Sequence, residues 1–524
     1  MKSILLERFP EIAMQLAFSQ PRPHYSSLAW KAPSNLEHIE TLYFCGEGMS
    51  TCYKALKKWL SENKKRTLVF FVEDLGPLAA LLEEDVATEL LSCPQIHLTR
   101  LWRHPSAHLE VSALRMTPKL RNLRQKLLRK NTVFYASLRE TAGAPALFKN
   151  LCPNIKHLPK CFSANALEGK FHNIPAIICG AGPSLTSSIK TQADKALIIA
   201  GGSAIAALEH LGISPHIAVA IDPHKEELER VKPLNAPLFF AARLLPAVLQ
   251  SSATSGYVHT ETGGSMEAWI LEKLGIKTKP IGVDLGSEAL SVTTFAVALA
   301  VTLGCNPIIL NGVDLAYTNN KPYAAGIAPQ PLPQETLQRK SQSGKKVQTK
   351  LTWIMESACL SAYAKKHPGH TFLNATPEGL GFSPIPYISL EQIPFEKKYD
   401  LRKKIQDEIE KNPMPVTAKQ IATLYQELQE SLQRQLVIAK EMQTSPSYGR
   451  SCLLQSDFEE EIAYACFFSH TPGALKFLKI DNIWQYYEAA IQSYLDTFLK
   501  NHEAVISSEI RDSREPMGHL NQIY

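Results

Sequence analysis

A short apolar run that leads directly into a glycine-rich turn is the first stretch of this sequence whose residue types could do chemistry. It reads IICGAGPSL, from Ile177 to Leu185. Glycine permits positive φ and close approach of the backbone to a ligand, and Pro183 and Ser184 suit the first turn of a helix. Such a turn presents backbone N–H groups, so we expect it to bind an anion such as phosphate. The candidate residues are Gly180, Gly182, Pro183 and Ser184.

Several later apolar runs also end in small or acidic residues. These residues are Gly202 and Ser203, then Asp222, then Thr262, Gly263 and Gly264, and finally Asp314. Small donors and carboxylates gathered at one sheet edge suit a phosphorylated nucleotide, with or without a divalent metal such as Mg²⁺. Glycine and aspartate are also ordinary turn residues, so each one alone has a purely structural explanation. Taken together, they predict a nucleotide-binding site.

Neither glycine-rich turn of the sequence fits the pattern for NAD. In IICGAGPSL, Leu185 occupies the position of the third glycine, and the next apolar run ends without an acid that could bind ribose. In the earlier turn GEGMST, Thr51 replaces the third glycine and Glu47 places a carboxylate beside the expected anion. We interpret this earlier turn as a strand-to-helix packing feature. We therefore expect no NAD cofactor.

The elements that must position these residues alternate between strand and helix, which predicts an α/β protein with parallel sheets. Residues 1–165 read as a small Rossmann-like α/β domain. Residues 166–395 read as a larger Rossmann-like domain with six apolar strands, namely PAIICG, KALIIAGG, HIAVAIDP, PLFFAAR, GYVHTETGG and NPIILNGVDL. Residues 396–524 are dominated by helix-period sequence. Because ligands bind where the carboxyl ends of parallel strands meet, the candidate residues should share one edge of the central sheet.

Composition places the chain among ordinary cytoplasmic globular proteins. The 524 residues are 45% hydrophobic, with a formal net charge of +6. The ten cysteines show no metal-ligand spacing, and we expect reduced thiols. The N-terminal stretch carries charges within its apolar part, and no later stretch is long and apolar enough to span a membrane. The basic run from Val111 to Arg139 is interpreted as a solvated helix face, so we expect no nucleic-acid partner.

Five stretches, taken in order, resemble a known family. They are ICGAGPSL, AIDP, GGSMEAW, GVDLAYT and FLNATPEGL. Together they resemble the central domain of the Maf proteins, bacterial motility-associated factors implicated in glycosylating flagellin with nonulosonic acids. That domain is similar to an archaeal 6-hydroxymethylpterin diphosphokinase, and the resemblance implies a sialyltransferase-like fold. The resemblance covers about residues 170 to 390, and the flanking parts fit the family more loosely.

The resemblance assigns roles to particular residues. It places Gly180, Gly182, Pro183 and Ser184 against the donor phosphates, and it matches Asp222 to an acid after the third strand. Asp314 and Tyr317 match the family signature in GVDLAYT, although Val313 replaces the more usual glutamine and removes one amide contact. Glu378 matches the final motif.

The implied activity is a glycosyl transfer from a CMP-type nucleotide sugar, carrying a nonulosonic acid-like sugar, to a Ser or Thr hydroxyl of an acceptor protein. The acceptor would be flagellin or another surface protein. The alternative is pyrophosphoryl transfer from ATP, as in the diphosphokinase, with Asp222 and Asp314 holding Mg²⁺. A non-catalytic protein that binds nucleotide or sugar is a third reading. The long flanking parts favour the transferase, because the archaeal kinases are single-domain proteins.

Glycosyl transfer to a hydroxyl needs a general base. His259, at the end of GYVHT, and His224, just after Asp222, are candidates, although an ordinary turn or surface histidine explains each of them. The expected catalytic set is Asp222, Asp314, Glu378 and His259. The polar, basic stretch from Pro331 to Lys350 is expected to be a mobile loop, and a lid that closes on an anionic donor is the functional alternative.

Overall fold

The computed structural model describes residues 2–512 except 20, 25–27, 34–35, 107, 232–234, 252–253, 263, 278, 286–290, 328–335, 396, 445, 479 and 481. Its contacts divide the chain into two compact units, Met1–Glu140 and Thr141–Tyr524. Helix α7, Ala144–His157, belongs by its contacts to the second unit. The boundaries near residues 165 and 395 stay predictions.

The first unit is a small parallel α/β sheet, as expected. Its strands have the order β3-β2-β1-β4, and every pair is parallel. The strands are β1 (Thr41–Cys45), β2 (Thr67–Phe71), β3 (Ile96–Thr99) and β4 (Leu109–Ala113), and the helices are α1 (Lys2–Arg8), α2 (Pro10–Ser19), α3 (Met49–Glu62), α4 (Gly76–Leu81), α5 (Ala87–Ser92) and α6 (Pro118–Ala142).

The second unit is built on an eight-stranded parallel sheet, which confirms the predicted fold class. The strand order is β14-β11-β6-β7-β8-β9-β10-β5. All six predicted strands are present, as β6 (Ala176–Cys179), β7 (Leu197–Gly201), β8 (Ile217–Ala220), β9 (Leu238–Phe240), β10 (Tyr257–His259) and β11 (Ile308–Asn311). The two edge strands, β5 (Phe162–Ser163) and β14 (Phe372–Asn374), are not among the predicted strands.

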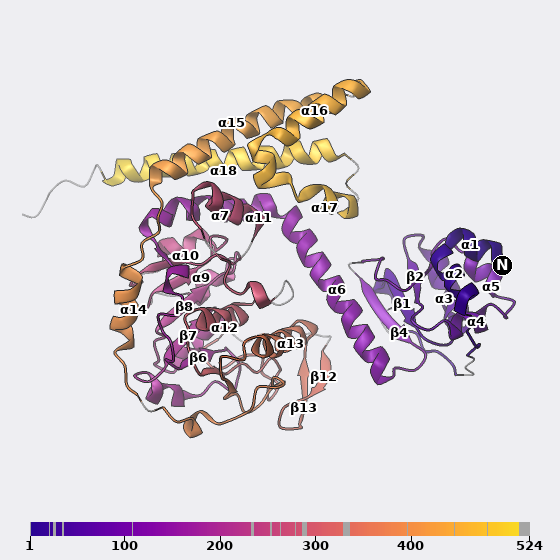
Figure 1. Ribbon diagram of the computed structural model, residues 1–524, viewed down its shortest axis with the longest axis horizontal. Coiled ribbons are helices and arrows are strands. Elements are labelled where there is room, and N and C mark those ends of the chain that lie inside the picture. Colours follow the sequence, from indigo (N-terminus) through magenta and orange to yellow (C-terminus); the bar gives the residue numbers. More distant parts are fainter. Residues whose placement is uncertain are drawn as a thin grey trace, which may run out of the picture. The chain divides into compact units, whose positions relative to one another are not determined.

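Apolar residues on both faces of the central strands explain why this sheet forms. Ile177 and Ile198 face one hydrophobic core, whereas Ile178 and Ile199 face another on the opposite side. Strands that are buried on both faces read as continuous apolar runs, as these do. The first core is covered by α7, α8 (Ser203–His210), α10 (Pro246–Ser251) and α11 (Ser265–Lys273), and the second by α12 (Val292–Thr302), α13 (Leu351–Lys366) and α14 (Leu401–Glu410) (Figure 1). The short helix α9 (Glu226–Arg230) follows β8.

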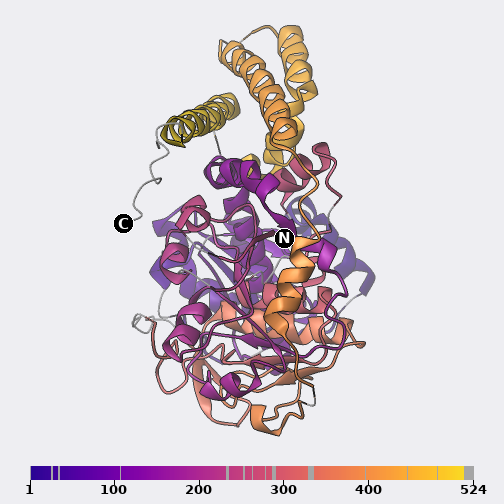
Figure 2. The same cartoon turned by 90° about the vertical axis from the view of Figure 1, so that its left-hand side faces the viewer.

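The C-terminal helices share a hydrophobic core with the central sheet. Tyr425 and Phe498 belong to the same core as Ile177, and the Tyr425 hydroxyl donates to the carbonyl of Cys152 at 2.9 Å. The helices are α15 (Ala418–Met442), α16 (Tyr448–Glu460), α17 (Thr471–Leu478) and α18 (Ile483–Asp512). They gather at one end of the second unit (Figure 2). This region is helical, as predicted, and it is continuous with the core of the central sheet.

Within the described residues, no helix is long and apolar enough to cross a membrane. The ten cysteines all lie in the described part of the chain, none of them forms a disulfide there, and only Cys452 among them is exposed.

A buried histidine makes the stability of the second unit depend on pH. His216 lies just before β8, and its Nδ1 accepts a hydrogen bond from the N–H of Ile198 at 3.0 Å. Burial lowers the pKa of His216 to about 4. Since the unfolded chain takes up this proton near pH 6.5, stability is complete above that value and is lost as the pH falls towards 4.

We expect the free energy of unfolding to fall by about 2 to 3 kcal/mol between pH 7 and pH 4.5 because of this one group. Urea unfolding at both pH values gives the change in the free energy of unfolding for wild type and for His216→Gln. The contribution of His216 is the difference between these two changes. Equal pH dependence in the two proteins would contradict the prediction.

Candidate functional site

The predicted site residues follow neighbouring parallel strands and lie at the carboxyl edge of the eight-stranded sheet. The turn from Gly180 to Ser184 follows β6, Gly202 follows β7, Asp222 follows β8 and Asp314 follows β11. The strand order runs outward in opposite directions from β6 and from β11, so the switch point lies between them. The shared edge is as expected, while the roles of the individual residues stay predictions.

At the switch point, the turns after β6 and β11 are locked together by Asp314. Its side chain accepts hydrogen bonds from the Ser184 hydroxyl at 2.7 Å and the Thr318 hydroxyl at 2.8 Å. A third hydrogen bond comes from the Ser184 N–H at 3.2 Å. Asp314 is buried, and desolvation raises the pKa of its carboxyl, while the two hydroxyl donors act in the opposite direction. The signature aspartate therefore holds two loops together.

The glycines of the GAGPSL turn are required by close packing in this structure. A Cβ on Gly180 would lie 2.3 Å from the carbonyl oxygen of Gly312, and a Cβ on Gly182 would lie 2.1 Å from Oδ2 of Asp314. A Cβ on Gly379, in the final motif, would likewise lie 2.2 Å from the carbonyl oxygen of Asp314. Packing thus accounts for these glycines, and phosphate binding by them stays a prediction.

Tyr317 is buried close to the hydrogen bonds that Asp314 accepts. Its ring lies 4.8 Å from that of Trp353, and the Lys350 amine lies 4.4 Å from the Trp353 ring centre. Burial raises the pKa of the Tyr317 hydroxyl. The arrangement is an aromatic and cationic cluster at the start of α13.

Asp222 lies in a separate cluster that sequence reasoning did not identify. Its Oδ1 accepts from the N–H of His224 at 3.0 Å, and its Oδ2 lies 3.5 Å from Nη1 of Arg230. The same guanidinium lies 3.4 Å from Oε2 of Glu227, whose side chain is 1% exposed. The stretch EELER reads as an exposed helix, so only the fold reveals that Glu227 is buried. Burial raises the pKa of Glu227 to about 7, and the charge of Asp222 adds to that rise.

The end of β10 is also more enclosed than expected. His259 is buried, and its Nε2 is 2.9 Å from Oε1 of Glu267. Burial and the charge of Glu267 raise the pKa of the neighbouring Glu261. Thr262 and Gly264 follow in the chain, and Gly263 lies outside the described residues. Since the His259 ring does not reach solvent, we do not assign it the direct contact with substrate that a general base needs.

The stretch expected to be a mobile loop forms a β-hairpin. Residues 331–335 lie outside the described part, and the rest forms β12 (Leu337–Lys340) and β13 (Lys346–Thr349), which pair antiparallel. The hairpin turn is tied to the loop after β14, because Lys345 pairs with Glu378 at 2.7 Å and Ser343 donates to it at 3.0 Å. Lys345 lowers the pKa of Glu378, which is therefore ionised at neutral pH. The expectation of a loop was wrong here, because tertiary contacts order this polar segment.

The residues present do not fit a magnesium ion shared by Asp222 and Asp314. Their strands, β8 and β11, are separated by β6 and β7. At about 4.8 Å per strand, the two strand ends lie about 14 Å apart. Both oxygens of Asp314 already accept hydrogen bonds. Among the described residues, no group of three or more His, Cys, Asp or Glu side chains is placed to hold a metal ion.

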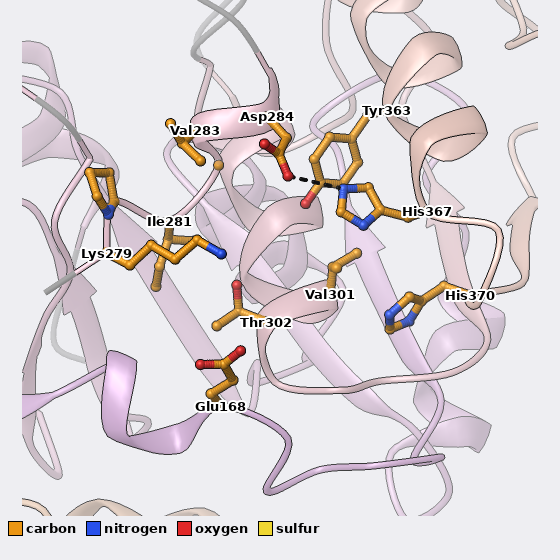
Figure 3. Close-up of a pocket in the computed structure, with 12 residues that line it drawn as sticks. Glu168, Lys279, Ile281, Val283, Asp284, Val301, Thr302, Tyr363, His367 and His370 are labelled. Carbon is orange, nitrogen blue, oxygen red and sulfur yellow. Dashed lines mark ion pairs between the residues drawn. The ribbon is translucent and has the colours of Figure 1, made fainter.

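A cavity of about 270 Å³ lies away from this edge, near the ends of α12 and α13 (Figure 3). Lys279, Thr302 and His367 line it, and Asp284 pairs with His367 at 3.7 Å. The ends of α12 and α13 precede β11 and β14, so the cavity is on the side where these strands begin. None of the predicted site residues lines it.

The glycine turn of the first unit is covered by apolar side chains. Gly46 and Gly48 adopt positive φ, as turn glycines do. A Cβ on Gly46 would lie 3.6 Å from Leu120, and one on Gly48 would lie 3.0 Å from Leu114. These contacts agree with the interpretation of this turn as a packing feature.

The fold and the position of the site define the second unit as a parallel α/β domain of the kind that binds ligands at strand carboxyl ends. Residues 149–320 match a family model described as 6-hydroxymethylpterin diphosphokinase MptE-like, which confirms the predicted similarity for this part of the chain. The chain is also similar to the solved structure of the Maf glycosyltransferase from Magnetospirillum magneticum AMB-1, with 13% identity over 97% of this chain and 96% of that chain and a TM-score of 0.48. No curated protein matches the chain.

Proposed function

We propose that this protein transfers a nonulosonic acid-like sugar from a CMP-type nucleotide donor to a Ser or Thr hydroxyl of an acceptor protein. The observation that supports the proposal most strongly is the gathering of the family motifs at one carboxyl edge of the central sheet. The motifs ICGAGPSL, AIDP and GVDLAYT contain the turns that follow β6, β8 and β11, and these turns begin at that edge. In this reaction the acceptor hydroxyl attacks the anomeric carbon and gives up its proton to a general base, while the bond to the nucleotide phosphate breaks and the phosphate leaves with the electron pair.

The second candidate is pyrophosphoryl transfer from ATP to a pterin. It is favoured by the description of the family model that matches residues 149–320. That chemistry relies on Mg²⁺ bridging the phosphates. The separation of Asp222 from Asp314 and the hydrogen bonds that occupy Asp314 speak against the shared ion that it would need.

A direct assay distinguishes the two activities. The purified protein is incubated with a CMP-linked nonulosonic acid and flagellin, and separately with ATP, Mg²⁺ and 6-hydroxymethylpterin. We expect release of CMP and an increase in the mass of flagellin in the first reaction, also with EDTA present. Formation of AMP in the second reaction, with no CMP release in the first, would contradict the proposal in favour of the kinase.

A further inference from the structure

The two glycine turns of the central sheet differ in what lies next to them. Added side-chain atoms at Gly180 and Gly182 would overlap the loop after β11, at 2.3 and 2.1 Å. At Gly202, the atoms nearest to a Cβ would be Val292 Cγ1 at 3.6 Å and Glu227 Oε2 at 3.9 Å. Gly202 also has a φ of 53°, which favours glycine. The space that a ligand needs for close approach to the backbone is therefore at the turn after β7.

This second turn is followed by an acid at the distance found in nucleotide-binding βαβ units. Asp222 comes 20 residues after Gly202, at the end of the adjacent strand. Strands β7 and β8 pair in parallel, with Gly201 opposite Val219, so both residues lie at the same edge. In such units the acid at the end of the second strand accepts hydrogen bonds from ribose hydroxyls. Asp222 is 33% exposed and thus accessible to a ligand.

The carboxyl group beside the same turn has one buried oxygen without a partner. Glu227 Oε1 has no hydrogen-bond partner in the described part of the chain, although the side chain is only 1% exposed. Its Oε2 contacts Arg230, which also contacts Asp222. A buried polar atom is normally paired, because leaving it unpaired costs free energy. The unpaired oxygen therefore points to a hydrogen-bond donor, such as a water molecule, that the described part of the chain does not supply.

We propose that the Gly202 turn, Asp222, Glu227 and Arg230 form a subsite for the ribose of a ribonucleotide. Asp222 accepts hydrogen bonds from the ribose hydroxyls, and the buried oxygen of Glu227 accepts one from a water molecule enclosed behind the ligand. Arg230 is a positioning residue that holds both carboxylates. The inference rests on the proposed function, because the ribose belongs to the nucleotide of the donor, and it moves the nucleoside from the turn after β6 to the turn after β7.

Calorimetric titration with CMP and 2′-deoxy-CMP tests the subsite. We expect wild type to bind CMP about tenfold or more tightly than 2′-deoxy-CMP, as one hydrogen bond to a charged group implies. In Asp222→Ala this preference should fall below about threefold. The matched control is Glu226→Ala, which removes a neighbouring exposed carboxylate of α9 and should keep the preference of wild type. Thermal melting confirms that each variant is folded.

The outcomes separate the subsite from the proposed function. If wild type binds both nucleotides equally well, or if folded Asp222→Ala keeps the full preference, the subsite is refuted while the transferase proposal stands. If neither nucleotide binds, and AMP and UMP also fail to bind, both proposals are contradicted.

Discussion

Replacing Gly182 with alanine is expected to destabilise the second unit by about 3 kcal/mol, with a large fall in melting temperature. The new Cβ would lie 2.1 Å from Oδ2 of Asp314 and 2.7 Å from the carbonyl oxygen of Gly312. To relieve this overlap, the turn after β6 must move away from the turn after β11. That movement breaks the hydrogen bonds between Ser184 and Asp314. Chemical denaturation followed by circular dichroism measures the change.

The matched control is Gly449→Ala, in α16, where an added Cβ meets nothing within 4 Å. We expect this variant to be as stable as wild type or slightly more stable, because alanine favours helix. A Gly182→Ala protein that keeps full stability would show that the contacts between the turns after β6 and β11 contribute little to stability. Full stability together with lost CMP binding would instead indicate that Gly182 contacts phosphate.

Replacing Asp314 with asparagine is expected to cost about 2 to 3 kcal/mol of stability. The buried carboxylate accepts three hydrogen bonds, from the Ser184 N–H and from the hydroxyls of Ser184 and Thr318. An amide can still accept from the Ser184 N–H only if its NH₂ group faces the two hydroxyls, which must then turn to accept, and the negative charge that strengthens all three hydrogen bonds is lost. Urea unfolding of the variant measures the loss.

Asp222→Asn serves as the comparison, since its side chain is one-third exposed and its Arg230 contact is long, at 3.5 Å. We expect a change within about 0.5 kcal/mol for this variant. Titration of CMP and ATP into both variants and wild type, with and without EDTA, then addresses metal dependence. We expect wild type to bind CMP equally well with EDTA. Nucleotide binding that needs metal in wild type and is lost in both variants would favour the kinase.

Much of the fold could be predicted because the strands of the second unit are buried on both faces. Ile177 and Ile178 point into opposite cores, so a continuous apolar run marks the strand in the sequence. The edge strand β14 lacks such a run, since it has only three residues and one neighbouring strand. The hairpin was missed for a related reason. Its residues are polar, so no apolar pattern marks its strands. The hairpin is held in place by Gln342, whose backbone N–H donates to the carbonyl of Gly379 and whose side-chain oxygen accepts from the side-chain amide of Asn374.

The sequence by itself determined the parallel α/β architecture, the helical C-terminal region and the carboxyl edge at which the motifs end, because periodicity and turn residues are local properties. It also carried the motifs of the family resemblance. Only the tertiary structure decided that the glycine turn after β6 is closely packed, whereas the turn after β7 has room for additional atoms beside Gly202. The residue that fills the first turn, Asp314, lies 130 positions from Ser184 in the chain. The burial of Glu227 was likewise decided by packing, because a short charged helix looks exposed until the elements around it are in place.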